Sequence, residues 1–325
     1  MLDGWMISGR VCGVWNGQVV LLSDGPLGVV SSPAAFGQAR PNADVDCLMN
    51  QHTDINEVRA FHARLMAIVS GSGDHRLERI FESVPREAFL GSGPWKIMVN
   101  NRYVETPSAD PVYLYQNILV ALDPAKGINN GEPFLHARWI GAVAPKGGET
   151  VVHIGAGSGY YTALLSMLAL PNGRVHAFEI EPALAHRASD NLAPFEGVSV
   201  VQGDATELPL PDCDLIYVNA GVVSPPRSWL KALRPGGRIV FPWRPSQELG
   251  IALIMTRTEA SFTVRLLGPA WFIPCVGAAD PASCVKTPTL LQARSISTGW
   301  LIEDRAPDDT ALAVCRDVWF SDRSG

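Results

Sequence analysis

Val151-Val152-His153-Ile154-Gly155-Ala156-Gly157-Ser158-Gly159-Tyr160 is the stretch of this 325-residue chain that decides its fold. Its first four residues are mostly apolar and predict a short buried strand. Three glycines at alternate positions follow, and the apolar residues 161–170 then predict a helix. A strand that leads through a glycine-rich turn into a helix is how α/β folds bind nucleotide-like ligands.

The spacing of these glycines indicates which ligand the turn binds. They follow the pattern G-x-G-x-G, whereas a dinucleotide-binding turn has G-x-G-x-x-G and would need a small residue at position 160. The chain has the bulky Tyr160 there. The spacing therefore favours methyl transfer from S-adenosylmethionine, and it makes a nicotinamide-dependent dehydrogenase the weakest interpretation.

Strands and helices alternate on both sides of this turn. Strands are predicted at residues 150–154, 174–179, 198–202, 213–218 and 238–242, and helices at 160–169, 182–193 and 226–233. Two further strand-like runs, 251–255 and 262–267, follow without a helix and predict an antiparallel hairpin at the edge of the sheet. The pattern as a whole predicts an α/β fold with a doubly wound, mostly parallel seven-stranded sheet and helices on both faces.

The chain is expected to have four parts. Residues 1–53 form an N-terminal extension, in which Asn16-Gly17 between two apolar runs favours a hairpin. Residues 54–133 are a helical and linker region that covers the substrate side, and Asp54 with Glu57 has the spacing of a helix capping box. Residues 134–280 form the S-adenosylmethionine-binding domain, and residues 281–325 form a C-terminal extension.

Composition narrows the class of protein. Hydrophobic residues make up 47% of the chain and charged residues 18%, which is typical of a globular protein. The formal charge of −6 weighs against a nucleic-acid partner. No apolar run is long enough to predict a membrane span, and no export signal is seen.

Cysteine and histidine spacing adds two expectations. The six cysteines are scattered without a CxxC pair, so we expect no zinc site, no disulfide framework and a reducing, cytoplasmic location. The seven histidines show neither H-x-x-x-H nor H-E-x-x-H spacing, and no metal site is predicted.

Candidate cofactor-binding residues follow the carboxyl ends of the predicted strands, where ligands bind open parallel sheets. The glycine turn can offer backbone N–H groups to a carboxylate. Glu179, at the end of the second strand, can accept from both hydroxyls of a ribose, and Asp204, after the third strand, can accept from an adenine amino group. The predicted S-adenosylmethionine site comprises Gly155, Ala156, Gly157, Ser158, Gly159, Tyr160, Glu179, Ile180, Asp204, Ala205 and Asn219.

Several side chains are candidates for binding or activating the substrate that accepts the methyl group. Asn219 follows the fourth predicted strand, where the reactive methyl is expected, and either orients substrate or caps the next loop. Asn130, Glu132 and His136 precede the domain and are the other catalytic candidates. His153 lies inside the first strand and is expected to be buried with its hydrogen bonds satisfied.

Four segments in the same order along residues 77–275 carry a family resemblance. They are Ser83–Phe89 (S-V-P-R-E-A-F), the glycine turn, Leu233–Pro242 (L-R-P-G-G-R-I-V-F-P) and Phe272-Ile273-Pro274. Together they resemble the protein-L-isoaspartate (D-aspartate) O-methyltransferases, within the class I S-adenosylmethionine-dependent methyltransferases. The resemblance implies a Rossmann-like fold, S-adenosylmethionine as methyl donor, and a peptide or protein carboxylate as acceptor.

The chain departs from this family at one segment. The family carries Q-T-I-S-x-P, whose hydroxyls border the acceptor carboxylate, whereas residues 128–133 read I-N-N-G-E-P, with Gly131 in the place of the serine. Asn129, Asn130 and Gly131 are therefore the predicted substrate-binding residues, with altered chemistry. A carboxylate acceptor needs no general base. A hydroxyl or amine acceptor needs one, and Glu132 and His136 are available.

Three hypotheses follow. The first is a carboxyl-directed methyltransferase of a peptide or protein, which includes acceptors other than damaged aspartate. The second is methylation of a small molecule or nucleic acid on the same fold, with the acidic charge against nucleic acid. The third is a non-catalytic methyltransferase-like binding protein, against which the intact glycines, Glu179 and Asp204 argue.

Overall fold

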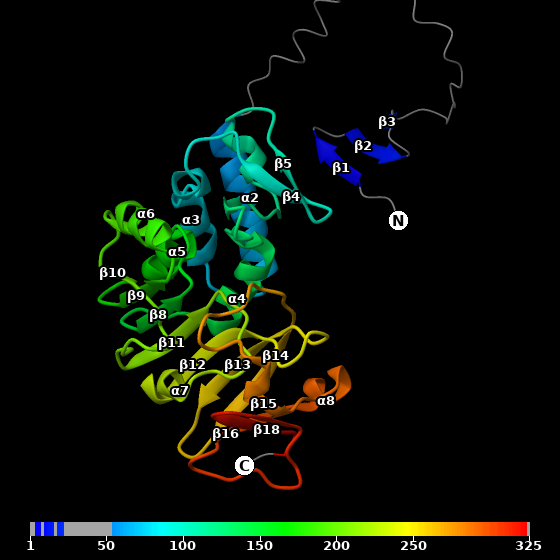
Figure 1. The fold of residues 1–325 in the computed structure, drawn as a ribbon. Coiled ribbons are helices and arrows are strands. Elements are labelled where there is room, and N and C mark those ends of the chain that lie inside the picture. Colours follow the sequence, from blue (N-terminus) through cyan, green and yellow to red (C-terminus); the bar gives the residue numbers. More distant parts are fainter. Residues whose placement is uncertain (1–3, 8–9, 16–17, 23–53, 324–325) are drawn as a thin grey trace, which may run out of the picture. The chain divides into compact units, whose positions relative to one another are not determined.

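The structure, a computed structural model, describes residues 4–7, 10–15, 18–22 and 54–323. It has two compact units, Met1–His52 and Thr53–Gly325. In the first unit, β1 (Gly4–Ile7), β2 (Arg10–Trp15) and β3 (Gln18–Leu22) form an antiparallel sheet (Figure 1). Trp15 pairs with Gln18 across β2 and β3, and the Asn16-Gly17 turn predicted between them lies outside the described residues.

An eleven-stranded mixed sheet is the centre of the second unit. Its strand order is β10-β9-β8-β11-β12-β13-β14-β16-β18-β17-β15. The strands that run parallel to one another are β8 (Thr150–Ile154), β9 (Arg174–Glu179), β10 (Val198–Gln202), β11 (Cys213–Val218) and β12 (Leu233–Trp243). The order places β8 next to both β9 and β11, so the carboxyl ends of these strands lie together.

The sheet is larger than the seven strands that we predicted. The hairpin of β13 (Ile251–Arg257) and β14 (Phe262–Pro269) is antiparallel, as expected, but it is not an edge, because β14 also pairs with β16 (Thr298–Leu301). Three more strands, β15 (Cys284–Lys286), β17 (Ala313–Cys315) and β18 (Val318–Ser321), come from the same C-terminal segment. These strands have three or four residues each, too few for a periodic pattern to identify them from sequence.

A disulfide joins Cys284 of β15 to Cys315 of β17, which corrects the expectation that the cysteines are all reduced. The two residues are direct partners in the antiparallel pairing of these strands. Spacing along the chain gave no indication of the bond, because the pairing of the strands brings the two sulfur atoms together.

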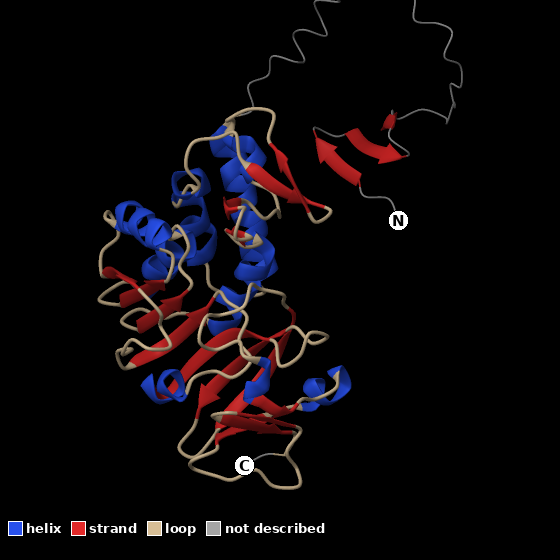
Figure 2. Ribbon diagram, in the orientation of Figure 1, coloured by secondary structure: helices blue, strands red, loops and turns tan. Residues whose placement is uncertain are grey.

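Helices cover both faces of the sheet (Figure 2). They are α2 (Ile55–Ser70), α3 (Arg76–Ser83), α4 (Pro133–Val143), α5 (Tyr160–Ala169), α6 (Pro182–Leu192), α7 (Arg227–Ala232) and α8 (Leu290–Ser295), with 3-10 turns η1 (Arg86–Phe89), η2 (Pro111–Leu114) and η3 (Pro281–Ser283). Successive side chains of a strand point to opposite faces. Val151 accordingly belongs to the core that includes α5, and Val152 to the core that includes Trp229 of α7.

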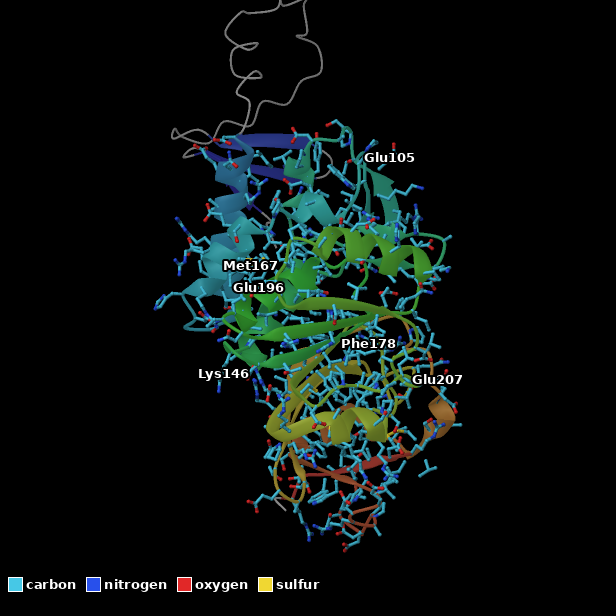
Figure 3. The ribbon with its side chains drawn as sticks, turned by 90° about the vertical axis from the view of Figure 1, so that its left-hand side faces the viewer. Glu105, Lys146, Met167, Phe178, Glu196 and Glu207 are labelled. Atoms are coloured by element: carbon cyan, nitrogen blue, oxygen red, sulfur yellow. A yellow bond between two sulfur atoms is a disulfide. The ribbon has the colours of Figure 1, made fainter. Side chains whose placement is uncertain are left out.

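The first helix begins where the sequence predicted. Asp54 caps α2, and its Oδ1 atom accepts from the backbone N–H of Asn56 at 2.9 Å. The chain between α3 and α4 contains two small antiparallel pairs, β4 (Lys96–Val99) with β5 (Arg102–Glu105), and β6 (Ala121–Asp123) with β7 (Ile128–Asn129). Side chains fill the space between the helices and the sheet, where Met167 of α5 and Phe178 of β9 are labelled in Figure 3. Among the described residues, no helix is both long and apolar enough to cross a membrane.

Candidate functional site

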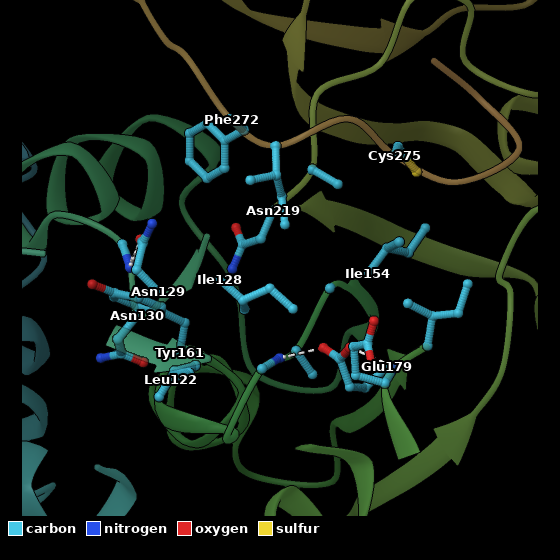
Figure 4. A pocket seen from close by; sticks show the side chains of 18 of the residues that line it. Leu122, Ile128, Asn129, Asn130, Ile154, Tyr161, Glu179, Asn219, Phe272 and Cys275 are labelled. Carbon is cyan, nitrogen blue, oxygen red and sulfur yellow. Dashed lines mark hydrogen bonds between the residues drawn. The ribbon is translucent and has the colours of Figure 1, made fainter. Parts of the chain in front are cut away.

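A cavity of about 640 Å³ lies at the carboxyl ends of the parallel strands (Figure 4). Each of the central strands supplies residues to its wall. These are Ile154, Gly155, Ala156 and Gly157 at the end of β8, Glu179, Ile180 and Glu181 at the end of β9, Gly203, Asp204 and Ala205 after β10, and Asn219 and Ala220 after β11. The cavity therefore lies where the strand order predicts a ligand site.

The glycine turn has a backbone that only glycine adopts without strain. Gly155, Gly157 and Gly159 have φ angles of 76°, 58° and 95°, in the left-handed region that disfavours side chains. A Cβ on Gly157 would also lie 3.0 Å from Leu122 Cδ1. The turn thus passes close to the β6–β7 pair, and the N–H of Gly157 donates to Glu179 Oε2 at 2.6 Å.

Glu179 is oriented by the backbone on either side of it. Its Oε2 atom accepts from Gly157, and its Oε1 atom accepts from the N–H of Glu181 at 3.0 Å. Because a carboxylate oxygen can accept more than one hydrogen bond, both oxygens can still accept from the two hydroxyls of a ribose. Burial raises the pKa of Glu179, against the effect of these backbone hydrogen bonds.

Only one oxygen of the Asp204 carboxylate accepts hydrogen bonds from the described part of the chain. Its Oδ1 atom accepts from the backbone N–H and from the hydroxyl of Thr206, both at 2.8 Å. Within the described part of the chain these bonds engage Oδ1 and leave Oδ2 for a ligand. The backbone cradle, the paired acceptors of Glu179 and the acceptor of Asp204 fit S-adenosylmethionine.

Part of the predicted cofactor set lies behind the cavity. Ser158, Gly159 and Tyr160, which lead into the start of α5, do not line it, and the side chains of Ser158 and Tyr160 are buried. The Tyr160 ring lies edge-on to Phe89, with 5.6 Å between the ring centroids. Gly155, Ala156, Gly157, Glu179, Ile180, Asp204, Ala205 and Asn219 all line the cavity.

The predicted acceptor residues line the same cavity. They are Asn129, Asn130, Gly131, Glu132 and His136, from β7 and the start of α4. Figure 4 shows Asn219 between Asn129 and Asn130 on one side and Ile154 and Glu179 on the other. The cavity thus joins the two halves of the site that the sequence predicted separately.

His136 is a buried, neutral side chain in the wall of the cavity. Its Nδ1 atom lies 2.9 Å from the hydroxyl of Tyr217, and its ring stacks on Tyr161 with 3.7 Å between centroids. Burial, helped by the neighbouring His153 and by the positive charge of Arg86, holds the pKa of His136 well below its usual range. The ring is therefore uncharged at neutral pH and a weak general base.

His153 is buried and fully hydrogen-bonded, as the sequence predicted. Its Nδ1 atom lies 2.8 Å from Thr162 Oγ1, and its Nε2 atom lies 2.9 Å from the amide nitrogen of Asn219. Three polar atoms of cavity-lining side chains have no hydrogen-bond partner in the described chain: Asn130 Nδ2, Tyr161 Oη and Asn219 Oδ1. Buried polar atoms without a partner are costly, and at a site they indicate where a ligand binds.

Sequence reasoning missed the role of Arg86, which it used only as part of a family motif. This side chain is fully buried. It donates to the carbonyl oxygens of Leu114 at 2.6 Å, Ile118 at 2.9 Å and Gly131 at 3.4 Å. Arg86 therefore anchors the segment that carries the acceptor residues, and nothing in the spacing of the sequence reveals these carbonyl partners.

Other contributors to the cavity were also missed. Tyr161 lines it, and Lys126 of the β6–β7 turn forms an ion pair with Glu181 at its edge. No group of three or more His, Cys, Asp or Glu side chains able to hold a metal is found among the described residues.

Comparison with known proteins gives a consistent result. The sequence profile of the family "Protein-L-isoaspartate(D-aspartate) O-methyltransferase (PCMT)" matches residues 64–280. A protein-L-isoaspartate O-methyltransferase of Methanopyrus kandleri is 29% identical over 227 residues, which cover 67% of this chain and 92% of that protein. Protein-L-isoaspartate O-methyltransferase 2 of Marinobacter nauticus is 30% identical over 230 residues, covering 69% and 95% of the two chains.

Solved structures support the fold. A protein-L-isoaspartate O-methyltransferase superposes with a TM-score of 0.57 at 21% identity, covering 80% of this chain and 86% of the other. A Plasmodium falciparum protein of the same description, solved with S-adenosyl-L-homocysteine, has a TM-score of 0.53 at 16% identity, covering 67% and 97%.

Proposed function

The chain belongs to the protein-L-isoaspartate (D-aspartate) O-methyltransferase family and is an S-adenosylmethionine-dependent methyltransferase, and from this premise we propose that it methylates an isoaspartyl carboxylate in a peptide or protein. The observation that carries the proposal is the single cavity. Residues suited to the methyl donor and residues suited to a carboxylate line one space, with Asn219 between them.

The two sides of the cavity come from two different parts of the chain. Residues 54–133 supply Asn129, Asn130 and Gly131 on the acceptor side, and residues 134–280 supply the donor side. The seven strands from β10 to β14 in the sheet order would be the doubly wound core of a class I methyltransferase, with the C-terminal segment added to its edge.

Each residue of the donor side has a role that its contacts support. Gly155 and Gly157 would let the backbone pass close to the methyl donor, while their N–H groups stay bound to the Phe178 carbonyl and to Glu179. Glu179 would accept from the ribose, and Asp204 from the adenine amino group. When bound, S-adenosylmethionine supplies a methyl group on a positively charged sulfur, which a nucleophile attacks in line. The protein contributes alignment of the two reactants, which is a large part of the barrier to such a reaction.

The side of the cavity proposed to bind the methyl acceptor has other hydrogen-bond donors in place of the family serine. Asn130 Nδ2 and Tyr161 Oη lack partners and line the cavity, so both can donate to a carboxylate. No general base is required, since a carboxylate is already a nucleophile. The neutral His136 is consistent with this, because it places no titrating group against the acceptor.

The test is transfer of labelled methyl from S-adenosylmethionine to an isoaspartyl peptide, read as base-labile ester released as methanol. The same peptide with ordinary aspartate is the substrate control. We expect transfer to the isoaspartyl peptide only, with kcat/KM reduced about tenfold or more in Tyr161→Phe, since a hydrogen bond to a charged group is lost. The neighbouring Tyr160→Phe, outside the cavity, should match the wild type.

An absence of transfer, with donor binding confirmed in the same sample, would overturn the isoaspartyl acceptor. Other peptides and small molecules carrying a carboxylate would then be the acceptors to test. Equal losses in Tyr161→Phe and Tyr160→Phe would show that the Tyr161 hydroxyl does not contact the acceptor.

A cytoplasmic location is a further part of the proposal. The free thiols of Cys213 and Cys275 fit a reducing compartment, whereas the Cys284–Cys315 disulfide weighs against one. Thiol labelling of the enzyme immediately after cell lysis tests it, because a reducing compartment would leave part of the Cys284–Cys315 pair open to the label.

A further inference from the structure

His153 and Asn219 form a buried contact that the proposed function has not used. His153 lies in β8 with no exposed surface, and Asn219 follows β11, the next strand in the sheet. The backbone N–H of Asn219 donates to the carbonyl of Ile154 at 2.8 Å, which fixes the position of Asn219 beside the glycine turn. A Cβ on Gly155 would lie 3.5 Å from Asn219 Cβ.

The hydrogen bonds of His153 determine its tautomer. The amide nitrogen of Asn219 can only donate, so the Nε2 atom that it faces at 2.9 Å must accept. A neutral imidazole carries one N–H, which is therefore on Nδ1 and donates to Thr162 Oγ1 at 2.8 Å. Burial lowers the pKa of His153 to about 3, so the ring stays neutral at physiological pH.

This arrangement also fixes which way the carboxamide of Asn219 is turned. With its NH₂ group bound to His153, the amide leaves Oδ1 as the remaining polar atom, and Oδ1 has no partner among the described residues. If His153 had the other tautomer, Asn219 would turn over and leave its NH₂ group instead. The pairing of His153 with Asn219 therefore decides whether this wall of the cavity offers a hydrogen-bond acceptor or a hydrogen-bond donor, and Thr162 supplies the acceptor that the Nδ1–H group needs.

We propose that His153 is a positioning residue that holds Asn219 with Oδ1 available to the positively charged sulfonium–methyl group of the methyl donor. A carbonyl oxygen attracts a cation and polarised C–H groups, whereas it repels the oxygens of a carboxylate acceptor. This orientation of Asn219 therefore suits the methyl donor and not the carboxylate that accepts the methyl group. The inference rests on the S-adenosylmethionine part of the proposed function and is independent of its isoaspartyl part.

The first test reads the tautomer in the enzyme without ligands. Long-range ¹H–¹⁵N correlation spectra of histidine-labelled enzyme distinguish Nδ1–H from Nε2–H, and His153→Asn assigns the signals by their disappearance. We expect Nδ1–H in the wild type and in Thr162→Ser, which keeps the hydroxyl. Thr162→Val removes it and should increase the population of Nε2–H. An Nε2–H tautomer in the wild type would overturn the proposal.

The second test compares binding of the charged S-adenosylmethionine with that of the neutral S-adenosylhomocysteine, by calorimetry without any acceptor. Loss of a C–H···O contact to a cation should lower the preference for S-adenosylmethionine about two- to fivefold in Asn219→Leu. The affinity for S-adenosylhomocysteine, which lacks the methyl group and the positive charge, should fall less than that for S-adenosylmethionine. Thr162→Val should shift the preference in the same direction, and Thr162→Ser should restore it.

Ser166→Ala is the matched control for both tests. Ser166 is a buried hydroxyl of the same helix α5 that donates to the carbonyl of Ala163 and does not line the cavity. An unchanged preference in folded Asn219→Leu, verified by its unfolding midpoint, would overturn the proposal. Because no acceptor is present, failure of isoaspartyl methylation leaves this result unaffected, while an enzyme that binds neither compound would overturn the methyl donor itself.

Discussion

The Nε2 atom of His136 lies 2.2 Å from the position that a Cβ would take on Gly131. Gly131 also has a φ angle of 71°, in the left-handed region. The imidazole therefore fills the space in which a side chain at position 131 would begin, and the family serine cannot be accommodated while His136 keeps its place. The glycine and the histidine therefore occupy one region of the acceptor wall.

This relationship predicts the result of restoring the serine. Gly131→Ser should lower the free energy of unfolding by about 2–4 kcal/mol, from overpacking and from the positive φ angle together. Gly148→Ser is the matched control, because Gly148 has a similar φ of 84° but no atom within 4 Å of an added Cβ. It should lose only about 1–2 kcal/mol. Equal losses in urea denaturation would show that His136 is no obstacle.

The double variant Gly131→Ser/His136→Val completes this test. Removing the imidazole takes away the overpacking but also the hydrogen bond to Tyr217, so the loss in the double variant should be about 1–2 kcal/mol smaller than the sum of the losses in Gly131→Ser and His136→Val. Additive losses would instead show that the two positions are independent.

Glu179 is expected to control affinity for the cofactor. Glu179→Gln replaces one acceptor with an NH₂ group that must face a backbone N–H, of Gly157 or of Glu181. Binding of S-adenosylhomocysteine, measured by calorimetry, should weaken about 10- to 100-fold. Glu207→Gln, a carboxylate outside the cavity, should bind like the wild type. Equal affinities of the wild type, Glu179→Gln and Glu207→Gln would show that Glu179 does not hold the ribose.

The pH dependence of binding follows from the same residue. Burial raises the pKa of Glu179, so its carboxylate is protonated at a higher pH than an ordinary glutamate when the solution is acidified. Protonation converts one acceptor oxygen into a donor. Affinity for S-adenosylhomocysteine should therefore fall as the pH drops through this raised pKa. In Glu179→Gln this component should be absent, and an identical pH profile in both enzymes would contradict the assignment.

The sequence predicted that the residues proposed to bind the methyl donor lie at one edge of the sheet, because their positions depend on strand order. Gly155, Glu179 and Asp204 follow three strands that are adjacent in the sheet, and the alternation of strands and helices was enough to place their ends together. The requirement for glycine at positions 155 and 157 is local, since it comes from the backbone of one turn.

The missing parts depend on tertiary packing. Arg86 binds carbonyls 28 and 32 residues away, and no local pattern specifies such partners. The disulfide required the pairing of β15 with β17, and the four extra strands were too short for their period to be read. The side chain of Asn219 was left open between orienting substrate and capping the next loop, and its hydrogen bond to His153, 66 residues away, is another contact that no local pattern specifies.

The disulfide should stabilise the C-terminal segment without affecting the cofactor site. It closes a loop with a sequence separation of 31 residues. Its removal in Cys284→Ser/Cys315→Ser should lower the free energy of unfolding by about 2–4 kcal/mol, because the unfolded chain regains freedom. Neither cysteine lines the cavity, so affinity for S-adenosylhomocysteine should be unchanged. Dithiothreitol should destabilise the wild type but not this variant; equal sensitivity would contradict a structural disulfide.

Buried histidines should make the enzyme sensitive to acid. Burial, with a contribution from the charge of Arg86, lowers the pKa of His62 to about 3, and burial lowers that of His153 to about 3. Both are neutral in the folded protein but take up a proton near pH 6.5 once unfolded. Their contribution to stability is complete above pH 6.5 and is lost as the pH falls from 6.5 towards 3, at about 1.4 kcal/mol per pH unit for each histidine.

His62→Leu separates this effect from general acid denaturation. Neither ring nitrogen of His62 has a hydrogen-bond partner in the described chain, so an apolar side chain of similar size should leave the stability at pH 7 unchanged or increase it. Its free energy of unfolding in urea should fall less steeply between pH 6 and pH 4, by about 1.4 kcal/mol per unit relative to the wild type. Parallel slopes would show that His62 is already protonated in the folded enzyme. The exposed His186→Leu is the control and should leave the slope unchanged, because that ring is largely in solvent.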